Sequence, residues 1–204
     1  SLAYPDRIGL RRPGEAPRYL LSGGKGARLE EGDALSGQRL LAVAETDGDP
    51  REARIRLAAP VAESELRALH AARLREVRVC EWSRRDRAVV ARERLMLGAL
   101  ALEDRHWRDV PADALGAALA EGVRDMGLQA LPWTDAARRL RARVEYLRAQ
   151  GAEMPDMSDA GLVEHLGTWL APHLAGMRRA EDLARLDLHA ALEAMLDWPR
   201  RRTL

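Results

Sequence analysis

The chain has 204 residues, of which 47% are hydrophobic and 32% charged, with a formal net charge of +1 at pH 7. This composition excludes a disordered chain, and the balanced charge gives no overall electrostatic attraction to nucleic acid. The single cysteine, Cys80, excludes an internal disulfide and a cysteine-built zinc site. Because no apolar run approaches the roughly 20 residues of a membrane span, and no secretory signal opens the chain, we expect a cytoplasmic protein without a membrane partner.

Two β-hairpins are predicted in the first part of the chain. Their strands are expected at residues 18–21, 27–29, 39–46 and 53–59. The glycine-rich stretch 22–26 joins the first pair, and Asp47-Gly48-Asp49-Pro50 forms a strong turn signal between the second pair. In the last strand, Ile55 and Leu57 alternate with arginines, which predicts one buried and one solvated face.

A short helix at about residues 63–72 follows, with apolar residues at helical spacing. A further β-meander then extends to about residue 104, with a turn at 83–86. Five to seven short strands with one helix fit a small, partly open barrel of the OB type. They fit a β-sandwich as well, and periodicity alone does not decide between the two.

The pattern becomes helical after Pro111, where apolar residues repeat every three or four positions. Thr134 or Asp135, Ser158 or Asp159, and Asp187 are the expected N-caps of later helices. We therefore predict an α+β protein: an OB-like β-barrel or small β domain over residues 1–108, and an all-helical domain of four to five helices over residues 109–204.

Candidate catalytic chemistry is sparse. The loop 22–26, with its exposed amides and Lys25, could hold a phosphate. Its spacing fits neither a phosphate-binding P-loop nor a dinucleotide fingerprint, and both need a strand-to-helix context, so a plain hairpin turn is favoured. The five histidines share no metal-ligand spacing. We predict no catalytic residue, no metal site and no cofactor in this chain, and hence no enzyme activity of its own.

Arginine clusters are the stronger signal for binding. Single-strand binding in OB folds combines a basic groove with aromatic stacking platforms. Trp82 directly precedes Ser83 and the arginine cluster Arg84, Arg85 and Arg87 that follows it, and Tyr19 lies on the strand that enters the glycine-rich loop. Core packing is favoured over base stacking for Trp82. For the arginines at 138–143 a solvated helix face is the default interpretation.

The chain resembles a known family along nearly its whole length. The resemblance is carried by the order and spacing of Tyr4–Gly9, Tyr19–Ala27, Leu40–Glu45, Ala53–Pro60, Leu97–Leu100, Gly127–Ala137, Trp169–Pro172 and Leu183–Leu188. These segments are similar to the C-terminal region of bacterial HrpB-type DExH-box ATP-dependent helicases. The nucleotide-binding and catalytic residues of that family have no counterparts here.

The resemblance implies an accessory part of an ATP-dependent RNA or DNA helicase. It implies that the parent protein uses ATP and Mg, and that this part encloses and guides single-stranded RNA or DNA beside motor domains of the same polypeptide. The residues expected to contact the strand are Lys25, Arg28, Arg84, Arg85 and Arg87. Two alternatives stay open: a module that docks a protein partner through its helical half, and a free-standing enzyme of unknown type.

Overall fold

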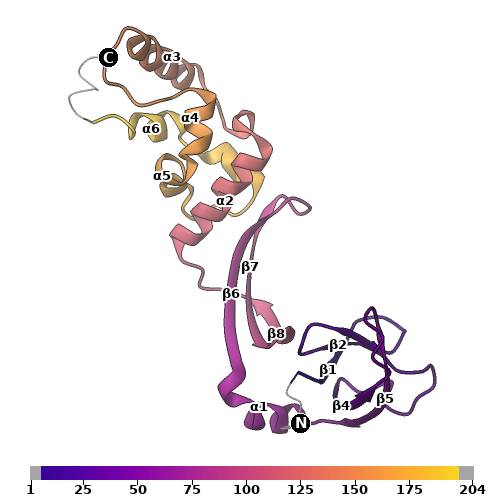
Figure 1. Cartoon of the computed structure of the whole chain (residues 1–204). Coiled ribbons are helices and arrows are strands. Elements are labelled where there is room, and N and C mark those ends of the chain that lie inside the picture. The colour runs from indigo at the N-terminus through magenta and orange to yellow at the C-terminus, as the bar shows by residue number, and fades with distance from the viewer. Residues whose placement is uncertain (1–5, 198–204) are drawn as a thin grey trace. The chain divides into compact units, whose positions relative to one another are not determined.

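The computed structural model describes residues 6–197 (Figure 1). The described chain divides into two compact units. The first comprises the residues up to 78 together with 92–106, and the second comprises 79–91 together with the residues from 107 onward. The domain boundary near residue 108 stays a prediction, but the hairpin segment 79–91 is grouped with the helices.

The first unit contains a closed barrel of five strands. These are β1 (Ile8–Arg11), β2 (Arg18–Leu21), β3 (Gly26–Arg28), β4 (Leu40–Thr46) and β5 (Ala53–Pro60). They follow each other around the barrel in the order β1-β2-β3-β5-β4, and β4 pairs with β1 to close it. All neighbours are antiparallel except β3 and β5, which are parallel. This arrangement confirms the OB-like barrel and the α+β class over the sandwich.

Alternation of side chains along the strands gives the barrel an apolar interior. Its interior is filled by the buried side chains of Tyr19, Leu21, Ala27, Leu29, Leu41, Val43 and Ile55. A second cluster is built from Ile8, Leu40, Leu66, Leu97, Leu100 and Leu102, and it includes residues of α1, β7 and β8. The barrel strands are therefore packed on both faces over part of their length.

The β-meander after the short helix was expected to belong to the barrel, and this expectation was wrong. β6 (Leu74–Ser83), β7 (Ala88–Leu97) and β8 (Leu100–His106) form a separate three-stranded sheet. Along the chain between β5 and β6, α1 (Glu63–Leu69) is followed by a 3-10 turn, η1 (Ala71–Arg73). These two segments replace the one continuous helix expected over residues 63–72.

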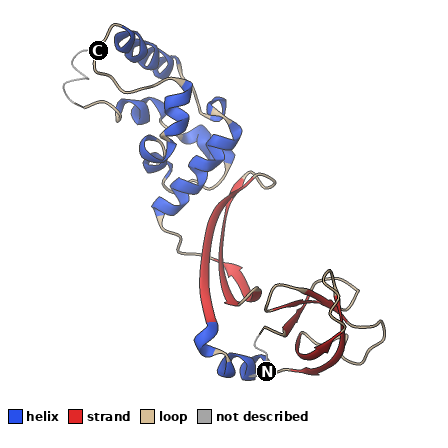
Figure 2. Cartoon of the chain, in the orientation of Figure 1, coloured by secondary structure: helices blue, strands red, loops and turns tan. Residues whose placement is uncertain are grey.

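The second unit is mainly helical (Figure 2). Its α-helices are α2 (Ala112–Met126), α3 (Asp135–Ala149), α4 (Asp159–Glu164), α5 (Leu166–Trp169) and α6 (Leu188–Glu193). Three 3-10 segments join them: η2 (Leu128–Ala130), η3 (Ala171–Leu174) and η4 (Ala180–Arg185). The side chains of Thr134, Ser158 and Asp187 accept the capping hydrogen bonds, which settles the N-cap expectations.

One buried apolar cluster holds these helices together. It includes Leu119 and Val123 of α2, Val144 of α3 and Leu166 of α5. Among residues 6–197, none of the helices combines the length and apolar character that crossing a bilayer requires.

Candidate nucleic-acid interface

The glycine-rich loop is a hairpin turn between β2 and β3, as predicted. The backbone N–H of Leu21 donates to the Lys25 carbonyl at 2.8 Å, and Gly24 has a φ of +93°. Buried Ser22 anchors the loop, because its Oγ accepts from the Ile8 N–H at 3.1 Å and its carbonyl accepts from the Ala99 N–H at 3.0 Å. No helix follows β3, so the loop does not fit the ATP phosphates in the manner of a P-loop. The Lys25 side chain is exposed on this anchored turn.

Strand register gathers three arginines on the outside of the barrel. Arg28 of β3 lies opposite Arg18 of β2 on one side and opposite Arg54 of β5 on the other. Residues directly opposite each other project from the same face of a sheet, so these side chains form one row. All three are exposed, while their chain neighbours Tyr19 and Ala27 point into the core. We call Arg18, Arg28 and Arg54 the arginine row.

Acidic side chains neutralise the two ends of this row. Nε of Arg18 lies 3.2 Å from a Glu52 carboxylate oxygen, and Arg54 pairs with Glu30. Arg28, in the middle, forms no ion pair within the part of the chain that the structure describes. The row therefore keeps an unpaired positive charge at its centre.

The turn between β4 and β5 adds a negative charge, the carboxylate of Asp47. The Asp47 carboxylate accepts hydrogen bonds from the backbone N–H groups of Arg54 and Asp49, and these bonds hold the pKa of Asp47 below its ordinary value. The charges of Arg56 and Arg28 lower this pKa further. Asp47 thus stays ionised at neutral pH and limits the basic surface on the side of the β4–β5 turn.

Of the arginine row, sequence reasoning selected Arg28 alone and missed Arg18 and Arg54. Each missed residue adjoins an inward-facing apolar residue, Tyr19 in β2 and Ile55 in β5, which is a signal for an outward side chain. Their alignment with Arg28 depends on the parallel pairing of β3 with β5, and no local pattern encodes that pairing.

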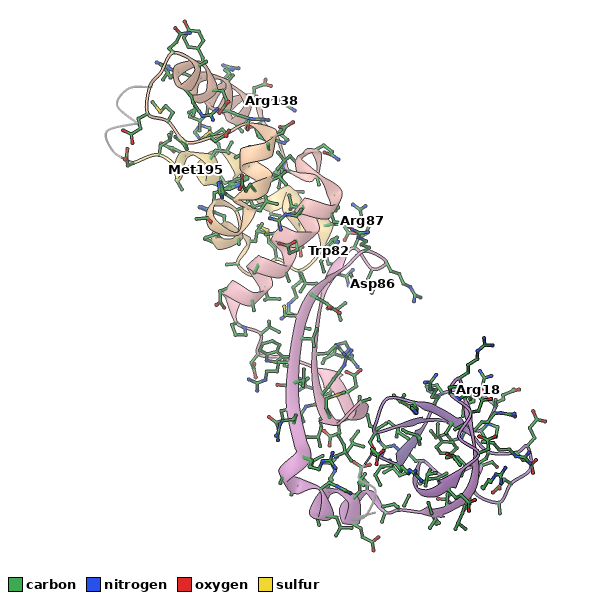
Figure 3. The ribbon with its side chains drawn as sticks, in the orientation of Figure 1. Arg18, Trp82, Asp86, Arg87, Arg138 and Met195 are labelled. Carbon is green, nitrogen blue, oxygen red and sulfur yellow. The ribbon has the colours of Figure 1, made fainter. Side chains whose placement is uncertain are left out.

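The other predicted arginines belong to the hairpin tip, residues 83–87, in the second unit, and Figure 3 labels Arg87 there. The tip is tied by Ser83, whose Oγ donates to the Asp86 carboxylate at 2.8 Å. Arg84, Arg85 and Arg87 are all exposed. Nη2 of Arg84 lies 2.6 Å from Oδ1 of Asp125, so part of its charge is neutralised.

Main-chain bonds bring a further basic pair to this tip. The Val89 N–H donates to the Arg178 carbonyl at 2.7 Å, and the Ala180 N–H donates to the Arg87 carbonyl at 3.0 Å. Arg178 and Arg179 are exposed and lie beside Arg87 for this reason. Sequence analysis did not select them, and nothing local could have, since the pairing joins segments far apart in the chain.

The aromatic residues considered for stacking are occupied elsewhere. Tyr19 is fully buried, and its hydroxyl faces the carbonyl oxygens of Gln38 at 2.9 Å and Leu35 at 3.0 Å. Burial raises the pKa of Tyr19. Nε1 of Trp82 donates to Asp125 at 3.2 Å while the Trp82 ring packs on α2, which agrees with the core-packing interpretation. Tyr19 is therefore not free to stack on a base, and Trp82 is held against α2 by packing and by its bond to Asp125.

Metal and thiol chemistry receive little support from the geometry. Across residues 6–197 no group of three or more His, Cys, Asp or Glu side chains is arranged to hold a metal ion. Burial raises the pKa of the Cys80 thiol, and its Sγ lies 3.5 Å from the Ala114 carbonyl. A raised pKa keeps the thiol protonated and disfavours nucleophilic reactivity.

Comparisons with known proteins place these features in context. No family model matches the chain. The ATP-dependent RNA helicase HrpB of Escherichia coli (strain K12) is 34% identical over an alignment 212 positions long, which covers 99% of this chain and 25% of the helicase. A crystal structure of the E. coli DExH-box NTPase HrpB is 33% identical with a TM-score of 0.49, covering 98% of this chain and 25% of that one. A crystal structure of the E. coli DEAH/RHA helicase HrpB is 29% identical with a TM-score of 0.46, covering 99% and 26%.

The chain thus spans about a quarter of the length of the proteins it matches. The alignment with this helicase extends along nearly all of the chain's residues. This sequence match confirms the resemblance predicted from the sequence: the chain is similar to the C-terminal region of an HrpB-type DExH-box ATP-dependent helicase.

Proposed function

We propose that this chain is an accessory C-terminal part of an ATP-dependent RNA or DNA helicase and guides single-stranded nucleic acid beside motor domains of the same polypeptide. The observation that carries this proposal is the arginine row across β2, β3 and β5. OB barrels bind oligonucleotides on the face formed by strands 2 and 3, which is where Arg18 and Arg28 lie.

The row suits contact with phosphates. Arg28 can bind a phosphate without first leaving an ion pair, whereas Arg18 and Arg54 would exchange a carboxylate for it. Lys25, at the end of the same hairpin, offers a further positive charge to the backbone of the strand. Contacts of this kind position a strand without reading its bases, and they weaken with salt.

A second set of phosphate contacts is proposed at the hairpin tip. Arg84, Arg85 and Arg87 form it, together with Arg178 and Arg179. ATP and Mg are assigned to the motor domains of the parent helicase, and no residue of this chain is proposed to act on them. The cytoplasmic location stays a prediction.

The rival interpretation, docking of a protein partner through the helical half, requires an exposed apolar stripe on a helix. The large hydrophobic side chains exposed within residues 6–197 are Leu57, Leu69, Val77 and Tyr146. Three of these belong to the first unit, so the described helices of the second unit present no such stripe.

The test is fluorescence anisotropy of labelled single-stranded RNA and DNA at low and physiological salt, with Arg28→Ala beside a control of equal charge change, Arg75→Ala. Arg75 is exposed in the same unit but lies outside the arginine row, and it bonds to backbone carbonyls of its own segment. We expect salt-sensitive binding that Arg28→Ala weakens and Arg75→Ala leaves unchanged. Losing one phosphate contact should reduce the slope of log K against log salt by about 0.7. Equal affinities for the two variants would refute the role of the row.

The hairpin tip needs a separate test in the intact helicase. Replacing Arg84 and Arg85 with Ala should weaken strand binding without unfolding the protein, because both side chains are exposed. Unchanged binding and unwinding would remove the tip from the proposal.

A further inference from the structure

Helix α3 has an exposed face on which two arginines accompany a tyrosine. Tyr146 is 65% exposed and is the one exposed aromatic side chain among residues 6–197. Arg139 and Arg143 precede it by seven and three residues, and such positions share one side of a helix. Ala142 lies between them and is small, so it leaves the tyrosine ring accessible. We call Arg139, Arg143 and Tyr146 the α3 face.

The two arginines differ from the others on the same helix in having no structural partner. Arg141 donates to the Met157 carbonyl and to Asp159, each at 2.6 Å, and Arg148 donates to Asp156 at 3.0 Å. By contrast, Arg139 and Arg143 form no ion pair or hydrogen bond through their side chains within the described residues. The fold therefore does not use their charges.

The acidic residue on this side of the helix leaves the arginines unneutralised. Asp135 lies one turn before Arg139, and its carboxylate is 3.6 Å from Nη1 of Arg138. An open hollow of about 530 Å³ borders the face at Ala142 and is also lined by Trp133 and Arg138. The guanidinium of Arg141 lies 5.3 Å from the centre of the Trp133 ring, so that ring is already covered on one side. Tyr146 is thus the accessible stacking surface.

We propose that the α3 face binds single-stranded nucleic acid, with Tyr146 stacking on a base while Arg139 and Arg143 contact the adjoining phosphates. This inference rests on the proposed function and adds a contact in the second unit that sequence analysis had interpreted as a solvated face. Proteins that bind single strands combine aromatic platforms with positive charge, since every base offers a ring face and every nucleotide a phosphate. Unpaired arginines alone would suit any anion. The exposed ring beside them favours nucleic acid over an acidic peptide.

The arginine row contains no aromatic side chain, and Tyr19 and Trp82 are occupied by packing. The α3 face therefore adds an exposed aromatic ring to the basic surfaces described above. Its preference between RNA and DNA is left to the binding measurement.

The experiment compares anisotropy titrations of labelled single-stranded RNA and DNA for four variants of the full chain. Tyr146→Phe keeps the ring, and Tyr146→Leu keeps only the apolar bulk. The double variant Arg139→Ala/Arg143→Ala removes both charges, and Arg108→Ala is its control on an exposed arginine outside the face. We expect Tyr146→Leu to weaken binding about fivefold or more, Tyr146→Phe to bind like the wild type, and the double variant to reduce the salt slope by about 0.7 per arginine.

The outcomes separate this inference from the proposed function. If Arg28→Ala weakens binding while Tyr146→Leu and the double variant bind like the wild type, the α3 face is refuted and the arginine row stands. If only the α3 variants weaken binding, the row is refuted and the α3 face stands. If the wild type binds neither oligonucleotide even at low salt, both are refuted. Because all substituted side chains are exposed, unchanged circular dichroism and melting temperature should accompany each result.

Discussion

Gly122 of α2 provides a test of how the hairpin tip is held in the second unit. A Cβ at this position would lie 2.6 Å from Cδ2 and Cε3 of Trp82, well inside the 3.5–4.0 Å of a favourable carbon contact. Gly122→Ala would therefore displace the indole ring. The Trp82 Nε1 bond to Asp125 would be disturbed, and Asp125 also pairs with Arg84 of the tip.

Two opposing terms decide the size of the effect. Alanine in place of glycine in a helix interior stabilises by about 1 kcal/mol. Forcing an extra carbon against a packed ring costs about 1–3 kcal/mol. With the weakened Trp82–Asp125 bond added, we expect a net loss of about 1–2 kcal/mol, which lowers the melting temperature of a chain of this size by about 2–8 °C.

Thermal unfolding followed by circular dichroism measures this loss in two backgrounds. In the wild type Gly122→Ala should destabilise, whereas in a Trp82→Ala background it should stabilise by up to about 1 kcal/mol, because only the helix term remains. Gly167→Ala is the matched control, since no atom lies within 4 Å of a Cβ built there. The same sign for Gly122→Ala in both backgrounds would refute the packing argument.

Three further predictions concern the two units. Burial, together with the charge of Arg73, lowers the pKa of His70 in the folded chain below its ordinary 6.5. The unfolded chain therefore binds the proton more readily than the folded chain. The contribution of His70 to stability should be full above about pH 6.5 and fall as the pH drops towards the lower pKa of the folded chain. Urea unfolding between pH 5 and 7.5 measures this fall, and a profile matching that of His70→Asn would contradict it. Thr134→Ala removes the acceptor of the Ala137 N–H bond and should cost about 1 kcal/mol in the same assay, while a loss of equal size in Thr134→Ser would contradict the capping role. Replacing Glu30 and Glu52 with Gln should strengthen oligonucleotide binding in anisotropy titrations, because it frees Arg54 and Arg18; weaker binding would count against the arginine row.

Turns and helix caps could be predicted from the sequence because their structure depends on residues close together in the chain. The turn at 47–50 and the glycine-rich turn at 22–26 both join antiparallel strands, as expected. The N-caps were narrowed to a few residues, of which Thr134 and Ser158 proved to be the caps. Turn chemistry and capping act over a few residues, so the local sequence is sufficient to predict them.

Features that join distant segments were not predictable in this way. Alternation in β6 and β7 resembles that of barrel strands, yet these strands form their own sheet. The sequence of β2 is compatible with Tyr19 facing either inward or outward. Tyr19 is buried because the barrel closes around it. Periodicity assigns side chains to one of two faces, but it does not say which face becomes the interior.

By itself, the sequence determined the α+β class, the order of the elements and the family resemblance, since each follows from patterns read along the chain. The tertiary structure alone decided which charges meet. Pairing of β3 with β5 aligns Arg28 with Arg54, and main-chain bonds to η4 and the residues before it bring Arg178 to the hairpin tip. Both depend on the register between segments far apart in sequence, which is set by the packing of the whole unit rather than by any local preference.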